Sequence, residues 1–211
     1  MFVMIMALQL QAQSATDVVL PSARHEVRVG WGDMMFETVA FHDSPSHNWA
    51  NTDVISDKYL TTDLVDHRYT GHIFADYHYN VLKWLAVGGQ IDFEGIFWKE
   101  VTYGKNHIQV GEAKDVKNYN VVLMPTVRFT YFHSQWVNLY SGLGIGLNIA
   151  CDNSNQREAA IAFNINLLSV SVGNEHWFGA VEFGLLNSLK NTNNIYMIGS
   201  RILSASVGYR F

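Results

Sequence analysis

Residues 203–211 alternate between two kinds of side chain. Every second position is apolar or aromatic, and the positions between are small or polar: Leu203, Ala205, Val207, Tyr209 and Phe211 against Ser204, Ser206, Gly208 and Arg210. A period of two residues is that of a β-strand with one apolar and one polar face. A final aromatic residue on the apolar face, with no polar tail after it, fits a strand that faces lipid and ends at the membrane interface. This stretch therefore predicts a strand of a membrane barrel.

The composition agrees with a chain that faces lipid. Charged residues make up only 16% and aromatic residues 13%, whereas soluble domains carry about 25% charged residues. The net charge of −5 argues against a nucleic-acid partner. No apolar run approaches the roughly 18 residues that a spanning helix needs, so a helical membrane protein is excluded.

Similar alternation recurs along the chain and predicts eight strands. The predicted strands cover residues 24–32, 69–79, 84–98, 119–132, 136–148, 159–168, 176–186 and 203–211. None of their odd-numbered positions holds Asp, Glu, Lys or Arg. Long connections (33–68, 99–118, 151–158 and 187–194) alternate with short ones (80–83, 133–135 and 173–175). In outer-membrane barrels the short turns and both termini are periplasmic and the long loops are extracellular.

With this pattern and the terminal Tyr209-Arg210-Phe211, the chain resembles the small outer-membrane β-barrels of the OmpA and OmpX type, in the form common in the Bacteroidota. The resemblance implies an all-β fold, an eight-stranded antiparallel up-and-down transmembrane β-barrel. It implies the outer membrane of a Gram-negative cell, with lipid and lipopolysaccharide as surroundings. It also implies that Tyr209 and Phe211 belong to the signal read by the barrel-insertion machinery.

The first residues predict a cleaved leader. Residues 1–13 contain an apolar run followed by small residues around Ala12, which is typical of a signal peptide. The positively charged start of such a peptide is missing, which fits a leader truncated at its beginning; the alternative is an apolar N-terminal arm. Residues 14–211 then form a single barrel domain.

Charged residues occupy inward positions of the predicted strands: Glu26, Arg28, Asp76, Asp92, Glu94, Arg128, Glu182 and Arg210. Side chains just fill the interior of an eight-stranded barrel, so these charges must pair or hold ordered water. We interpret them as a polar network that plugs the lumen; the alternative is a gate or a proton path. Glycines at positions 142, 144 and 146 suit a crowded interior.

Two other classes of barrel stay open. A soluble, lipocalin-like barrel would turn its apolar face inward around a ligand. The polar face here, with Gly88, Ser204 and Ser206, carries few of the Lys and Glu residues that a water-exposed sheet would show. A lipid-modifying enzyme at the membrane interface would need an activated Ser. The adjacent His133 and Ser134 fall in a predicted periplasmic turn, so we expect no enzyme.

No cofactor or metal site is expected. His42, Asp43 and His47 match no recognised metal-ligand spacing. No glycine-rich phosphate motif opens a helix, which leaves nucleotide binding without support. Cys151 is the single cysteine and predicts a structural free thiol. Pro125 lies at an outward position of its strand, where its missing N–H predicts a bulge.

The first loop is the place where we expect a specific function. Residues 33–68 number about 35, above the roughly 15 beyond which a loop in a compact domain is usually functional or disordered. The loop carries aromatic residues and histidines: Phe36, Phe41, Trp49, Tyr59, His42, His47 and His67. These favour an extracellular ligand; the alternative is that they fold back and cap the barrel mouth.

Overall fold

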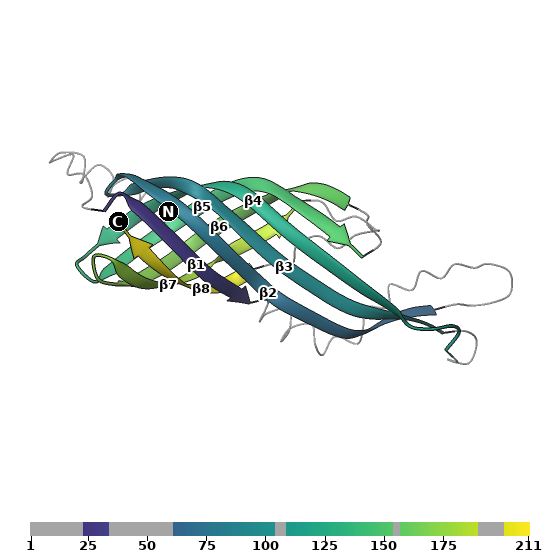
Figure 1. The fold of residues 1–211 in the computed structure, drawn as a ribbon. Coiled ribbons are helices and arrows are strands. Elements are labelled where there is room, and N and C mark those ends of the chain that lie inside the picture. Colours follow the sequence, from purple (N-terminus) through teal and green to yellow (C-terminus); the bar gives the residue numbers. More distant parts are fainter. Residues whose placement is uncertain (1–22, 34–60, 104–108, 154–156, 190–200) are drawn as a thin grey trace, which may run out of the picture.

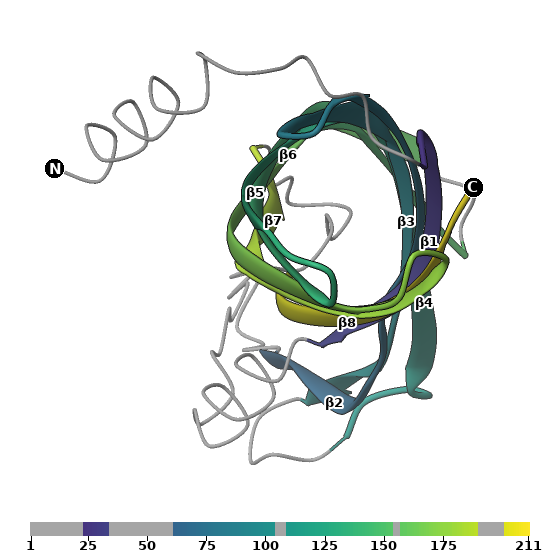
Figure 2. The same ribbon diagram turned by 90° about the vertical axis from the view of Figure 1, so that its left-hand side faces the viewer.

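The computed structural model describes residues 23–33, 61–103, 109–153, 157–189 and 201–211. They form eight strands: β1 (His25–Asp33), β2 (Thr61–Leu82), β3 (Leu85–Tyr103), β4 (Lys114–His133), β5 (Val137–Asp152), β6 (Arg157–Gly173), β7 (Trp177–Ser188) and β8 (Arg201–Arg210). Each strand pairs antiparallel with its neighbour in sequence, and β8 closes the ring onto β1. The predicted up-and-down barrel is confirmed (Figures 1 and 2).

The apolar face of the strands is the outer face. Val29 on β1 is 64% exposed and Ile145 on β5 is 61% exposed, whereas the residues of opposite parity are mostly buried. Further exposed aliphatic residues continue this band around the wall: Ile73, Val87, Ile91, Leu123, Leu143, Leu147, Ile161, Leu167, Val181 and Val207. The described residues contain no helix of the length and hydrophobicity needed to cross a membrane. Because the apolar side chains face outward, the alternative of a soluble barrel with an inward apolar face is wrong.

The strands of the first half are longer than predicted. β2 begins at Thr61, β3 continues to Tyr103 and β4 begins at Lys114, so the ends predicted for the first two long loops, at residues 68, 99 and 118, are wrong. The three strands extend together past the rest of the barrel (Figure 1). In this extension the exposed positions are charged, as at Lys99 and Lys117, whereas the apolar side chains of Trp98 and Val116 are buried. The polarity of odd and even positions is thus the reverse of that in a membrane crossing, which is why the pattern missed these ends. Residues 1–22 and 34–60, with the predicted leader and most of the first loop, lie outside the described residues.

The alternation of long and short connections is confirmed except at the third long loop. That loop was predicted at residues 151–158, but β5 continues to Asp152 and β6 begins at Arg157, which leaves only residues 153–156. At one end β2 and β3, β4 and β5, and β6 and β7 are joined by short turns. β1 begins and β8 ends at this same end, where the N–H groups of His25 and Phe211 each donate to the other residue's carbonyl, both at 2.9 Å. We refer to it as the turn end and to the opposite end as the loop end.

Irregular pairing marks the wall at several places, but not at Pro125. The registers of β4 with β3 and β5 run on unchanged past Pro125, so the predicted bulge is wrong there. The shift in β4 lies between Thr130 and Phe132. Another lies in β2 at Gly71, whose φ of 69° suits glycine. The simple alternation of odd and even positions ends at these shifts.

Candidate functional site

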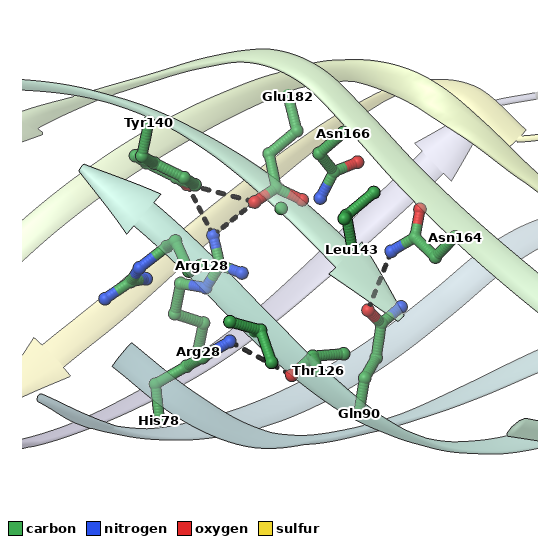
Figure 3. Close-up of a pocket in the computed structure, with 12 residues that line it drawn as sticks. Arg28, His78, Gln90, Thr126, Arg128, Tyr140, Leu143, Asn164, Asn166 and Glu182 are labelled. Atoms are coloured by element: carbon green, nitrogen blue, oxygen red, sulfur yellow. Dashed lines mark hydrogen bonds and ion pairs between the residues drawn. The ribbon is translucent and has the colours of Figure 1, made fainter. Parts of the chain in front are cut away.

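Arg28 on β1 is the centre of a buried ion-pair network in the lumen. Its guanidinium donates through Nε and Nη2 to the two carboxylate oxygens of Asp76 on β2, at 2.8 and 2.7 Å. Its Nη1 donates to Glu182 on β7 at 2.5 Å and to the hydroxyl of Tyr140 on β5 at 2.6 Å. Tyr140 in turn donates to Glu182 at 3.0 Å (Figure 3). Charged groups so buried are stable only when paired and hydrogen-bonded, and here the guanidinium reaches three other strands.

Glu26, two residues before Arg28, extends this network toward the turn end. Its carboxylate forms ion pairs with Arg128 on β4 and, at 3.0 Å, with Arg210 on β8. Arg128 also lies over the ring of Tyr140, with 4.9 Å between its Cζ and the ring centroid. Glu26 and Arg128 are buried, while the side chain of Arg210 is 17% exposed. We call Glu26, Arg28, Asp76, Arg128, Tyr140, Glu182 and Arg210 the turn-end network.

Asp92 and Glu94 on β3 belong to a second network nearer the loop end. Asp92 accepts from Arg201 on β8 at 2.6 Å and lies 2.9 Å from Nδ1 of His72 on β2. Glu94 accepts from the amide of Asn120 on β4 at 3.2 Å. The predicted single network is thus divided: Asp92 pairs with Arg201 rather than with Arg28, Arg128 or Arg210, and Glu94 lies 3.6 Å from Nε2 of His72. We call Asp92, Glu94, His72, Arg201 and Asn120 the loop-end network.

Uncharged side chains fill the space between the two networks. Val122, Met124, Ala162 and Leu186 form a buried apolar cluster. Beside it, the amide of Asn164 donates to Gln90 at 3.2 Å, and Gln90 donates to Asp92 at 3.3 Å. A cavity of about 10 Å³ is lined by polar groups that include Arg28, Thr126 and Asn164 (Figure 3). That is room for about one water molecule, so the lumen is nearly filled around Arg28.

Sequence reasoning missed three kinds of lumen residue. Arg201 has an odd number and would face outward if the alternation of β8 continued, but pairing between β7 and β8 is irregular from Phe183 to Leu186, and Arg201 is buried. Tyr140 lies at an inward position of β5, the strand for which the prediction named only glycines as interior residues. His72 and His78 lie at even-numbered, inward positions of the predicted strand 69–79, but as histidines they are not among the predicted lumen charges. His78 lies 3.2 Å from Asp76.

The residues considered for chemistry occupy structural positions. The hydroxyl oxygen of Ser134 accepts from the N–H groups of Trp136 and Val137, at 3.4 and 3.3 Å, within the turn between β4 and β5. Cys151 is a free thiol on β5, half-buried. Within the described ranges, no His, Cys, Asp and Glu side chains gather in a group that could hold a metal ion. His42, Asp43 and His47 lie outside those ranges.

The two residues of the predicted assembly signal lie in an aromatic chain on the outer face at the turn end. Phe211 stacks on His25, with ring centroids 5.2 Å apart and planes 13° apart. Tyr209 lies against Trp177, with centroids 4.9 Å apart. These ring contacts thus join β7, β8 and β1 where the barrel closes.

A comparison with known protein families agrees with this architecture. The family model of the outer membrane protein beta-barrel domain matches residues 1–211. Among solved structures, the outer membrane protein OprG from Pseudomonas aeruginosa is similar at 13% identity and a TM-score of 0.40, covering 92% of this chain and 99% of that one. LpxR from Salmonella typhimurium is similar at 7% identity and a TM-score of 0.28, covering 90% and 100% of the two chains. No curated protein matches the sequence.

Proposed function

Because the chain belongs to the outer membrane protein β-barrel domain family, it is a barrel of the outer membrane, and we propose that it is a non-enzymatic one whose lumen is closed by a polar plug. The plug is the turn-end network together with the loop-end network. In this proposal the barrel has a structural role in the membrane and interacts with partners through its loop end.

The observation that carries the proposal is the contact between Arg28 and Tyr140. In a closed ring of eight strands, β1 and β5 lie opposite each other, and the guanidinium of Arg28 reaches the hydroxyl of Tyr140 at 2.6 Å. A bond between opposite walls divides the lumen at that level, and the buried side chains of Arg128 and Glu182 lie beside it. Because Glu182 and Asp76 hold the same guanidinium from two further strands, it has little freedom to move aside.

Single-channel recording in planar bilayers tests the plug. The wild-type protein should give at most small, flickering currents. Arg28→Ala combined with Tyr140→Ala removes both sides of the contact and should produce a larger conductance. Lys83→Ala, in the turn between β2 and β3, is the control and should behave as wild type. A steady, large conductance from the wild-type protein would contradict the plug.

The geometry around Ser134 supports the non-enzymatic part of the proposal. A catalytic serine needs a free hydroxyl next to a base, but the Ser134 oxygen accepts two backbone N–H groups of its own turn. Incubating the purified protein with lipid A in detergent micelles should leave the mass spectrum of the lipid unchanged. Loss of an acyl chain or of a phosphate from the lipid would show that the barrel is an enzyme.

A further inference from the structure

Charged side chains return to the outer face of the wall at the loop end. Arg24 and Lys83 are exposed at the turn end. Between that end and the level of Tyr119, the described outward positions hold no charged residue. From the level of Tyr119 toward the loop end, exposed cations occur on alternate strands, among them Arg68 on β2, Lys117 on β4 and Arg157 on β6. We call these three residues the outer cation row.

Strand register places these cations beside one another. Arg68 pairs with Phe97, and Phe97 pairs with Lys117, so these two cations are two strands apart at one level. Arg157 pairs with Cys151, and Cys151 pairs with Tyr119, two residues from Lys117. With strands about 4.8 Å apart and about 3.4 Å per residue, Lys117 is roughly 10 Å from Arg68 and roughly 12 Å from Arg157, measured between Cα atoms.

Two described carboxylates near this row lie opposite, or pair with, other cations. Asp115 is an exposed carboxylate two residues beyond Lys117, and it lies directly opposite Lys99 in the register of β3 and β4. Glu100 forms its ion pair with Lys114, at 4.0 Å. The ion pairs among the described residues involve none of the three cations of the outer row. The row therefore presents net positive charge outward.

The row lies at the depth where lipid headgroups begin. Tyr119 contacts Phe97 edge to face, with ring centroids 5.7 Å apart, and stacks with Phe93 at 6.2 Å. Aromatic residues of this kind mark the membrane–water interface. Closer to the middle of the membrane than this aromatic patch, exposed aliphatic residues on the same outer face, such as Ile91 and Leu123, pair across the strands and face the acyl chains. Cations just outside the aromatic patch therefore meet the headgroups of the same leaflet.

We propose that the outer cation row is a docking site for the phosphate groups of lipid A, the phosphorylated glycolipid of the outer leaflet. The loop end of an outer-membrane barrel faces the cell exterior, so this leaflet is the one that the row contacts. Cations spaced by roughly 10 Å suit a headgroup with more than one phosphate better than a single phosphodiester. Arg68 and Arg157 can each bind a phosphate through two N–H groups, and Lys117 adds a point charge between them. The proposal uses only the outer face and is independent of the lumen plug.

Binding of lipid A to the purified barrel in an uncharged detergent tests the site. The test variant is Arg68→Gln/Lys117→Gln/Arg157→Gln, and the matched control is Arg24→Gln/Lys83→Gln, which removes exposed cations at the turn end. The triple variant should bind diphosphorylated lipid A about tenfold or more weakly, because each basic residue near an anionic headgroup contributes to binding. The control should stay within about twofold of wild type, since its charges lie near the other leaflet.

Further ligands identify what the row recognises. Wild-type protein should bind dephosphorylated lipid A as weakly as the triple variant binds the phosphorylated form. Equal binding of the two lipids, or of the triple variant and wild type, would overturn the proposal. So would phosphatidylglycerol or inorganic phosphate competing as well as lipid A. If the triple variant fails to fold, Lys117→Gln alone replaces it; its expected loss of affinity is about threefold, and unchanged affinity would likewise overturn the site.

Discussion

Nε and Nη2 of Arg28 donate to the two carboxylate oxygens of Asp76 at 2.8 and 2.7 Å, joining β1 to β2 inside the barrel. Both side chains are buried, with 3% and 0% of their surface accessible. The same guanidinium holds Glu182 and Tyr140. Asp76 therefore fixes the group from which the turn-end network branches.

Asp76→Ala should strongly destabilise the barrel. Removing one partner of a buried ion pair leaves the other charge uncompensated, which typically costs about 3–5 kcal/mol. The free energy of unfolding can be measured by urea titration of the protein in lipid vesicles, followed by tryptophan fluorescence. Lys114→Ala breaks an exposed pair with Glu100 and should change stability by no more than about 0.5 kcal/mol. Equal stability of the two variants would show that Asp76 holds nothing in place.

Deleting Phe211 should reduce assembly more than replacing it. Phe211→Ala removes the stack on His25 but keeps the two backbone hydrogen bonds with that residue, whereas deletion removes both. The folded fraction is the form that migrates differently on unheated gels. We expect wild type to give the largest fraction, Phe211→Ala an intermediate one and the deletion the smallest. An unchanged folded fraction in the deletion variant would show that Phe211 has no role in assembly.

Substitution by alanine should change the stability of the barrel differently at two glycines of β7. A Cβ at Gly184 would meet the backbone of β6, with Asn166 Cα 2.7 Å away, whereas at Gly179 the nearest atom is the Ser206 carbonyl oxygen at 3.8 Å. Gly184→Ala should destabilise by roughly 1–3 kcal/mol through overpacking. Gly179→Ala should be neutral or slightly stabilising, because alanine loses less backbone entropy in a strand. Urea midpoints of the two variants give the comparison, and a destabilised Gly179→Ala with an unaffected Gly184→Ala would refute it.

Replacing residues 34–60 by an Asn-Gly turn should leave a folded barrel and abolish any surface adhesion or ligand capture that the wild-type cells show. Extending the deletion to residue 68 should destabilise the fold, because Thr61–Val65 pair with Lys99–Tyr103. Heat modifiability reports folding in both variants, and adhesion of whole cells reports function. If the first variant cannot fold, residues 34–60 are structural and the functional assignment of this loop is wrong.

The sequence placed the strands within the membrane correctly because lipid and lumen impose opposite polarity on neighbouring positions. Val29 and Ile145 could be assigned to the outer face, and Glu26 and Arg28 to the inner face, from position parity alone. In the extension of β3 and β4 the exposed positions are charged and the buried ones, such as Trp98 and Val116, are apolar, so the same rule gave no signal for Lys114 at the start of β4 or for Tyr103 at the end of β3. Gly71 and the other register shifts also end the parity rule.

The sequence by itself determined the eight-strand barrel, the outward apolar face and the set of charges that had to be buried. It could not determine which of those charges pair. Arg28 and Tyr140 are far apart in sequence and meet because closure of the ring places β1 opposite β5. Asp92 pairs with Arg201, which alternation would place outside, because irregular pairing between β7 and β8 turns Arg201 inward. Whether a strand position is polar or apolar is read directly from the residue there. Which side chains meet across the lumen depends on how the barrel closes and on the strand register, and only the tertiary structure determines these.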